Sequence, residues 1–380
     1  MRHVYLDYNA TTPVHPEVLE TMTAFYRERF GNPSSIHWAG RWVKGAVEKA
    51  REKVALLVNC EPVEVVFTSG GTEADNMAIK GVATALRDRG NHIITLRTEH
   101  PAVTNACLYL ERQGYEVTWL GVDRDGLPDL QELEAAITAR TILISAMYAN
   151  HETGTLLPVA EIGEIAAGRK IYFHCDAVQA AGKVPVDFRG SGISLLALSG
   201  HKFQAPKGVG ALVIRKGVKL TPLMHGGPQE RNRRAGTENV AGIVALGRAC
   251  ELAIDDMSAA ARRLASLRDL LEEGIRAVVP DVQVNGSRQQ RLPNTANLSF
   301  PAMEADSLLL NLDLAGIAAS SGSACSSGVL KNSPVLAAMG VEPELSKGAI
   351  RFSLGRETGE ADIDYLFQVL PGIVERLRKH

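Results

Sequence analysis

Two ionisable residues stand directly after apolar runs that have the character of buried strands. Lys202 follows Leu198-Ser199-Gly200-His201, and Asp176 ends the run Tyr172-Phe173-His174-Cys175. A lysine at the carboxyl end of a strand is partly desolvated, which lowers its pKa enough for it to form a Schiff base. A buried carboxylate needs a cationic partner, and a protonated pyridine nitrogen would supply one. Lys202 could instead be an ordinary surface lysine, and Lys207 is a rival candidate for the Schiff base. Asp176 could instead cap the next turn.

A glycine pair between a β-branched run and a helical pattern could bind an anion. The segment reads Thr68-Ser69-Gly70-Gly71-Thr72-Glu73. Glycines let the backbone approach an anion, and a helix N-terminus offers unpaired N–H groups, so a phosphate would fit here. The spacing matches neither GxxxxGK[ST] nor GxGxxG, which makes a nucleotide site a weak interpretation. A plain tight turn with Thr72 as the helix N-cap is the alternative.

One cysteine lies in a run of small residues. Every residue of 318–328 except Cys325 is Ala, Ser or Gly. Such a segment cannot pack a core, so we expect a mobile arm with an exposed thiol; a linker with an incidental cysteine is the alternative. The other cysteines stand in helical or strand patterns and are expected to be inert. They are Cys60, Cys107, Cys175 and Cys250.

Composition excludes several classes of protein. The 380 residues are 45% hydrophobic and 22% charged, and 41 basic against 43 acidic residues give a net charge of -2, which disfavours nonspecific binding to nucleic acid or membranes. The N-terminus does not resemble a signal peptide, and no apolar run approaches the roughly eighteen residues of a spanning helix. Five cysteines without a CxxC pair, and histidines without HExxH spacing, predict reduced thiols in the cytoplasm and no metal site.

The order of elements predicts an α/β fold. Strand-like runs at 64–67, 92–96, 141–147 and 195–199 alternate with helical patterns, which indicates a mostly parallel sheet covered on both faces. Beyond residue 238 long helical stretches and a few short strands follow. We therefore predict a large α/β domain over 15–255 and a smaller α+β domain made of 1–14 and 256–380, with Pro371 kinking or interrupting the last helix.

Taken together and in this order, the segments resemble the pyridoxal-phosphate-dependent cysteine desulfurases of the NifS type, within the aminotransferase class V group. The resemblance covers nearly the whole chain. It rests on the segments above and on five more. These are Tyr5-Leu6-Asp7-Tyr8-Asn9-Ala10-Thr11-Thr12, Gly31-Asn32-Pro33-Ser34-Ser35, Thr98-Glu99-His100-Pro101-Ala102-Val103, Asn150-His151-Glu152-Thr153-Gly154 and Ile350-Arg351-Phe352-Ser353-Leu354. The fold it implies is that of the pyridoxal-phosphate transferases, aminotransferase fold type I.

The resemblance also implies a role for each site residue. Lys202 would carry pyridoxal 5′-phosphate and act as the base at the substrate Cα, with His100 stacking on the ring and helping proton transfers. Asp176 would keep the pyridine nitrogen protonated and Gln179 would bond the phenolic oxygen. The phosphate would be held by Gly71, Thr72, Ser199 and His201, together with Thr237 from the second subunit of a homodimer. Asn150 and Arg351 would fix the substrate carboxylate.

The reaction implied is the conversion of L-cysteine to L-alanine, with the sulfur passing to Cys325 as a persulfide. A sulfur-acceptor protein, either an iron–sulfur scaffold or a tRNA-thiolation enzyme, would then receive it. Selenocysteine lysis or another class V reaction is the nearest alternative, and a sulfur-relay protein without turnover is a more distant one. A transaminase would not need a cysteine on an arm of small residues, so Cys325 favours desulfuration.

Overall fold

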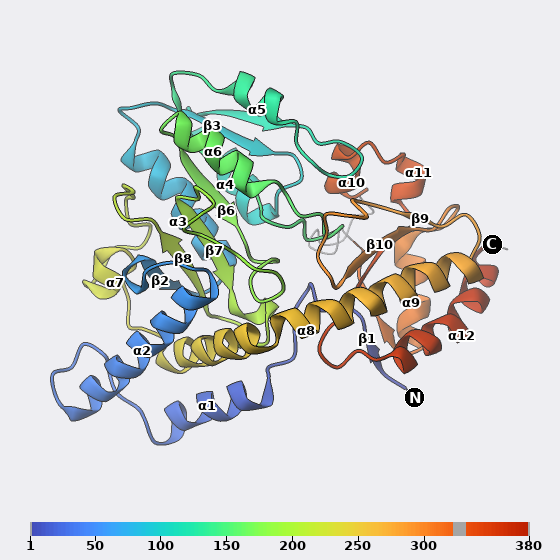
Figure 1. Ribbon diagram of the computed structural model, residues 1–380, viewed down its shortest axis with the longest axis horizontal. Coiled ribbons are helices and arrows are strands. Elements are labelled where there is room, and N and C mark those ends of the chain that lie inside the picture. Colours follow the sequence, from blue (N-terminus) through green and yellow to red (C-terminus); the bar gives the residue numbers. More distant parts are fainter. Residues whose placement is uncertain (1, 322–331, 379–380) are drawn as a thin grey trace.

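The computed structural model describes residues 2–321 and 332–378, and a seven-stranded sheet lies at its centre (Figure 1). β8 is antiparallel to both of its neighbours, and the other neighbouring pairs are parallel. The predicted mostly parallel sheet is therefore confirmed. Its strands, in spatial order, are β2 (Val65–Thr68), β8 (Gly210–Ile214), β7 (Leu195–Ser199), β6 (Tyr172–Asp176), β5 (Thr141–Ser145), β3 (His92–Leu96) and β4 (Glu116–Leu120).

Helices cover both faces of this sheet. Val66 and Leu195 pack against one helical layer, whereas their neighbours Val65 and Leu196 pack against the other. Because both faces are buried, the strands read as continuous apolar runs rather than as an alternation. One layer holds α3 (Gly71–Ala85) and α4 (Pro101–Arg112), and the other holds α2 (Trp38–Leu57) and α6 (Val159–Gly168). The other helices of this unit are α1 (Pro16–Arg27), α5 (Leu130–Ala136) and α7 (Gln229–Asn232), and Val18 of α1 and Leu133 of α5 are buried in the same core as α2 and α6.

A smaller antiparallel sheet lies beside the large one in Figure 1. Phe300, Phe352 and Leu366 belong to its core, and all three are fully buried. Its strands are β12 (Ala349–Ser353), β10 (Thr295–Ser299) and β9 (Gln283–Val284). Around it lie α9 (Ala305–Leu314), α10 (Pro334–Ala338), α11 (Pro343–Ser346) and α12 (Glu360–Arg378). The chain's first strand, β1 (Val4–Tyr5), pairs in parallel with β11 (Ile317–Ala318), so the N-terminus lies with this smaller unit.

A single long helix joins the two units. α8 (Val240–Val278) runs from beneath the large sheet to the smaller unit (Figure 1). Its first part, including Leu246, is buried in the large core, and its last part, including Leu271, is buried in the small one. The predicted boundary at residue 255 falls inside this helix. The division into two domains is therefore not marked by a break in secondary structure.

Of the two effects predicted for Pro371 in the last helix, the interruption is wrong. α12 continues through Pro371 without interruption. Buried residues on both sides of Pro371, among them Leu366, Leu370 and Ile373, hold the helix against the small core. Tertiary packing outweighs the lost backbone bond here. Within the described residues, no helix combines the length and the apolar character that a bilayer-spanning segment needs.

Candidate active site

Four strands of the large sheet end around one cavity of about 230 Å³. β3 leads to His100, β5 to Met147, β6 ends at Asp176 and β7 ends at Ser199. Ligands of open α/β sheets bind outside the carboxyl ends of the strands, as this cavity would allow. Eight of the residues singled out from the sequence line it. They are Gly71, Thr72, His100, Asp176, Gln179, Ser199, His201 and Lys202.

Lys202 is held at the cavity by the N-terminal segment. A short 3₁₀ turn, η2 (Gly200–Lys202), follows β7 directly. Lys202 Nζ donates hydrogen bonds to the carbonyl oxygens of Asn9 at 2.6 Å and Ala10 at 3.0 Å. The backbone N–H of Thr12 donates to the carbonyl of His201 at 2.9 Å. The opening motif of the chain therefore positions the lysine of a motif almost two hundred residues later.

Asp176 is one of several buried carboxyl groups near the cavity. Its Oδ1 accepts a hydrogen bond from the backbone N–H of Val178 at 2.9 Å. Burial and the neighbouring Asp75 raise the pKa of Asp176 to about 6, and the proximity of His100 opposes this. Burial also raises the pKa of Asp75 and Glu99 well above their usual range. A cationic partner for Asp176 would offset the cost of keeping its charge in this environment.

The imidazole of His100 has a defined tautomer. His100 caps the N-terminus of α4, and its Nδ1 accepts a hydrogen bond from the backbone N–H of Ala102 at 3.1 Å. Since Nδ1 is an acceptor, the neutral ring carries its proton on Nε2. Burial lowers the pKa of His100, and the nearby Asp176 opposes that shift. His151, whose pKa burial lowers much further, packs edge-on against His100 at a ring distance of 5.3 Å.

The N-terminus of α3 supplies the anion-binding part of the cavity. Gly70 has φ +152° and ψ -173°, a conformation essentially restricted to glycine. At Gly71 a Cβ atom would lie only 2.7 Å from Val178 Cγ2, so a side chain would be forced against the cavity wall. Burial and the ammonium groups of Lys202, Lys207 and Lys183 lower the pKa of His201 to about 4. This electropositive setting beside a helix N-terminus suits a phosphate.

Gln179 is fixed by two partners of opposite kind. Its Oε1 accepts a hydrogen bond from Lys183 Nζ at 2.8 Å, and its Nε2 donates to the Asn9 carbonyl at 3.0 Å. Lys183 Nζ also donates to Asn9 Oδ1 at 3.1 Å. Neither Lys183 nor the side chain of Asn9 was singled out from the sequence.

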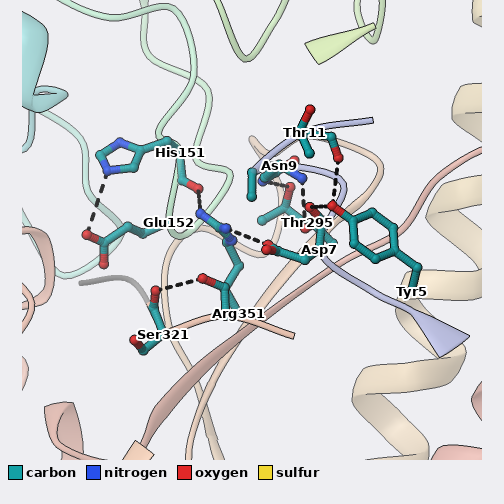
Figure 2. A network of polar contacts seen from close by, with 12 residues as sticks. Tyr5, Asp7, Asn9, Thr11, His151, Glu152, Thr295, Ser321 and Arg351 are labelled. Atoms are coloured by element: carbon teal, nitrogen blue, oxygen red, sulfur yellow. Dashed lines mark hydrogen bonds and ion pairs between the residues drawn. The ribbon is translucent and has the colours of Figure 1, made fainter. Parts of the chain in front are cut away.

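Arg351 lies next to the cavity but does not line it. Its Nη2 forms an ion pair with Asp7 Oδ1 at 2.7 Å, and its Nη1 donates to the His151 carbonyl at 3.0 Å (Figure 2). Its Nε is buried and has no hydrogen-bond partner among the described residues. Asn150 does not line the cavity either. Its Oδ1 accepts hydrogen bonds from the backbone N–H groups of Glu152 and Thr153, and its Nδ2 donates to the Thr98 carbonyl. Both assignments to the substrate carboxylate stay predictions.

Thr237 is exposed and lies away from this cavity. It borders a separate hollow that Ser69 and Arg234 also line. The nearby Arg234 forms a bidentate ion pair with Glu73, which orders the segment in front of Thr237. A contribution of Thr237 to a phosphate site in a second subunit stays a prediction.

Cys325 lies outside the described residues, but both flanks of its segment are placed. Ser320 forms an antiparallel bridge with Arg351, and Ser333 Oγ donates to Glu152 Oε2 at 2.5 Å. Glu152 directly follows His151, which lines the cavity. The two flanks are therefore fixed beside the cavity.

The four described cysteines are buried. Burial raises the pKa of Cys60 and of Cys107 to about 12, and it raises the pKa of Cys175 and Cys250 as well. They are thiols at neutral pH and poor nucleophiles. Among the described residues, no three His, Cys, Asp or Glu side chains are arranged to hold a metal ion.

Comparisons with known proteins identify the family. Residues 4–366 match the aminotransferase class V family. The chain belongs to this family. It is 53% identical over 377 residues to the cysteine desulfurase IscS of Dictyoglomus turgidum, covering 99% of this chain and 96% of that one. It is 54% identical to the cysteine desulfurase IscS of Methanosarcina thermophila, covering 99% and 93%. The solved structure of a NifS-like protein superposes with a TM-score of 0.93 at 40% identity and covers all of both chains.

The cofactor of aminotransferase class V desulfurases is pyridoxal 5′-phosphate, and the cavity fits it. A lysine, a buried carboxylate and a helix N-terminus surround one space, which matches an aldehyde, a pyridine nitrogen and a phosphate. Asp75 and Lys183 lie near this site but were not singled out from the sequence. Asp75 stands four residues after Gly71 on α3, and that helical spacing was its available signal, whereas Lys183 follows Gln179 on turns, where no such spacing applies.

Proposed function

We propose that this chain is a cysteine desulfurase that converts L-cysteine to L-alanine and transfers the sulfur to Cys325. The observation that carries the proposal is the position of the described residues on either side of the Cys325 segment. Its two flanks are tied to Arg351 and Glu152, beside a cavity that has the residues for pyridoxal phosphate. The similarity to proteins named cysteine desulfurase supports the same conclusion.

Each group of the cofactor has residues that would hold it. Lys202 would bind the aldehyde carbon, Asp176 would accept a bond from the pyridine N–H, and Gln179 would donate to the phenolic oxygen. Ser199, His201 and the α3 N-terminus at Gly71 and Thr72 would bind the phosphate. When bound, pyridoxal phosphate supplies an electron sink for the negative charge that develops at the substrate Cα.

The chain's own residues would perform the proton and sulfur transfers. Lys202 Nζ would take the proton from Cα and keep it for return to the product. His100, with its proton on Nε2, is placed to exchange protons at the cavity. The Cys325 thiolate would attack the substrate sulfur, so that a sulfur–sulfur bond forms while the bond from sulfur to Cβ breaks. Protonation of the remaining carbon skeleton gives alanine.

Arg351 would hold the substrate carboxylate. Its buried Nε has no partner within residues 2–321 and 332–378, and its planar fork suits a carboxylate. Asn150 would act with it after its own loop rearranges, since its amide is engaged by that loop. A carboxylate on Arg351 would compete with Asp7 for Nη2.

The protein would act in the cytoplasm and pass the persulfide sulfur to an acceptor protein, either an iron–sulfur scaffold or a tRNA-thiolation enzyme. It would do so as a homodimer. Large apolar side chains exposed along α1, α2 and the loop between them support a subunit interface. They are Tyr26, Phe30, Ile36, Trp38 and Trp42. In such a dimer the exposed Thr237 would complete the partner's phosphate site. Sedimentation of the holoenzyme tests the dimer, and a fully active monomer would contradict it.

The test of the function compares wild type with Lys202→Ala. The control is Lys216→Met, which changes an exposed lysine. Wild type and control should be yellow and produce equal amounts of alanine and transferable sulfur from L-cysteine. Lys202→Ala should keep its fold by circular dichroism but contain no cofactor fixed by borohydride, and it should lose at least about 10³-fold of the activity. A borohydride-fixed cofactor in Lys202→Ala would show that another lysine carries it.

A further inference from the structure

Lys183 lies behind Gln179 on the turns that follow β6. The backbone N–H groups of Lys183 and Val184 both donate to the Ala180 carbonyl, and Gly182, with φ +76°, reverses the helical sense of the turn just before Lys183. This places Lys183 Nζ 2.8 Å from Gln179 Oε1. Its second acceptor, Asn9 Oδ1 at 3.1 Å, belongs to the residue whose carbonyl oxygen binds Lys202.

The amide of Asn9 has only one orientation in this network. Asn9 Nδ2 donates to Thr295 Oγ1 at 2.8 Å (Figure 2), and Asn294 Nδ2 donates to Asn9 Oδ1 at 3.1 Å. Asn9 is 1% exposed, so water cannot replace these partners if the amide turns over. The amide therefore keeps Oδ1 on the side of Asn294 and Lys183. Lys183 is therefore anchored by an acceptor that does not depend on Gln179.

The amide of Gln179 is oriented by Lys183 together with Asn9. The Asn9 carbonyl oxygen only accepts, so Nε2 faces it, and Oε1 accepts from the amino group of Lys183, whose pKa burial and the nearby Lys202 and Arg351 hold well below its usual range. Nε2 carries two N–H groups, and one of them is used by Asn9. The other is a donor on a residue that lines the cavity. A hydrogen bond into Oε1 also strengthens the N–H groups of the same amide as donors.

We propose that Lys183 is a positioning residue that fixes the amide of Gln179 so that an N–H, and not the carbonyl oxygen, meets the phenolic oxygen of the cofactor. The proposal rests on the function proposed above for Gln179. Without Lys183, Oε1 would be buried without its donor, and only the bond from Nε2 to the Asn9 carbonyl would hold the amide. The second N–H would then be held less firmly toward the phenolic oxygen, and the hydrogen bond to that oxygen would weaken.

The readout is the colour of the resting holoenzyme as a function of pH, which requires no turnover. A donor to the phenolic oxygen stabilises its negative charge and disfavours the protonated Lys202–cofactor linkage. Loss of that donor should therefore raise the pH midpoint of the visible absorbance change. We expect Gln179→Met and Lys183→Met each to raise it by about half a pH unit or more. Lys183→Arg, which keeps the donors, should have a midpoint close to that of wild type, and Lys216→Met should show no shift.

A double-mutant cycle separates action through Gln179 from a direct effect of charge. If Lys183 acts through Gln179, then Lys183→Met adds little to a protein that already carries Gln179→Met. Equal shifts in both backgrounds would overturn the proposal, because a bare loss of positive charge is additive. A shift in Gln179→Met with none in Lys183→Met would overturn it while leaving the proposed function intact. No shift in Gln179→Met would contradict the role of Gln179 itself. Thermal midpoints of all variants report whether the fold is retained.

Discussion

Burial sets the charge of most ionisable side chains around the cavity. It raises the pKa of the carboxyl groups of Asp75 and Glu99 and lowers the pKa of the imidazoles of His151 and His174. His174 Nε2 lies 3.3 Å from Asp75 Oδ1, and this pair is best described as neutral, because burial disfavours both charges. The site therefore concentrates its charge on few groups, which suits a cofactor that brings both a dianion and a protonated ring.

Glu152 provides a test of this account at one residue. Burial raises the pKa of Glu152 to about 7, although the Ser333 hydroxyl and Arg351 oppose the shift. An unfolded chain releases this proton at about pH 4.3. Between the two values the folded state holds a proton that the unfolded state has lost, so stability falls as pH rises through this window. Glu152→Gln mimics the protonated form. Between pH 5 and pH 8 its free energy of unfolding should therefore rise relative to that of wild type by up to about 3 kcal/mol.

The measurement is the difference in thermal midpoint between Glu152→Gln and wild type at a series of pH values. Glu164→Gln changes an exposed glutamate on α6 and serves as the control, with a difference that should not vary over this range. A constant difference for Glu152→Gln as well would mean that Glu152 ionises normally.

At the scale of single residues, sequence could predict groups that end strands and could not predict their distant partners. Lys202, Asp176 and the glycine pair before Thr72 are recognisable because strand ends and helix starts are local features. The Asn9 carbonyl that binds Lys202 lies 193 residues away, and Asp7 lies 344 residues from Arg351. Such contacts are set by the sheet topology, and no local spacing signals them.

One unusual element precedes the Thr237 segment. Glu230, Arg231 and Asn232 have φ values of 45°, 57° and 62°, so three successive non-glycine residues adopt the left-handed conformation. This conformation costs about 1–2 kcal/mol per residue. The Glu230 carboxylate offsets the cost by accepting bonds from the backbone N–H of Phe67 and, at 2.8 Å, from both Nη atoms of Arg51. The buried ion pair therefore fixes the direction in which the chain approaches Thr237.

Removing the charge of Glu230 should lower the stability of the folded protein. Glu230→Gln leaves Arg51, whose side chain is 3% exposed, without its buried counter-charge. We expect a loss of about 3 kcal/mol or more in the free energy of unfolding, measured by denaturant titration. Glu48→Gln is the matched control because Glu48 also pairs with Arg51 but is half exposed, and it should cost less than about 1 kcal/mol. Equal costs for the two variants would show that burial of the pair is not decisive.

At the scale of elements, sequence could predict the alternation but not every boundary. β7 has the predicted bounds, since its apolar run ends sharply at Ser199 and Gly200. The left-handed turn at Glu230 was not foreseen, because none of its residues is a glycine. The continuity of α12 through Pro371 also depends on packing that periodicity does not reveal.

On the scale of the whole molecule, the cavity depends on both units. The large sheet provides the strand ends, and the smaller unit provides Arg351 and the flanks of the Cys325 segment. The N-terminal segment joins them, because Asp7 pairs with Arg351 (Figure 2) while the Asn9 carbonyl accepts a hydrogen bond from Lys202. Movement of one unit against the other would therefore change the distance between Lys202 and the flanks of the Cys325 segment.

The central claim is that Cys325 receives the sulfur, and mass spectrometry of the holoenzyme after a brief pulse of L-cysteine tests it most directly. The account predicts one added sulfur atom on the peptide that contains Cys325, because the described cysteines are buried thiols with raised pKa values. Cys325→Ser should bind the cofactor and L-cysteine, but it should form no persulfide and almost no alanine. Added sulfur on Cys60, Cys107, Cys175 or Cys250, or normal turnover by Cys325→Ser, would contradict the account.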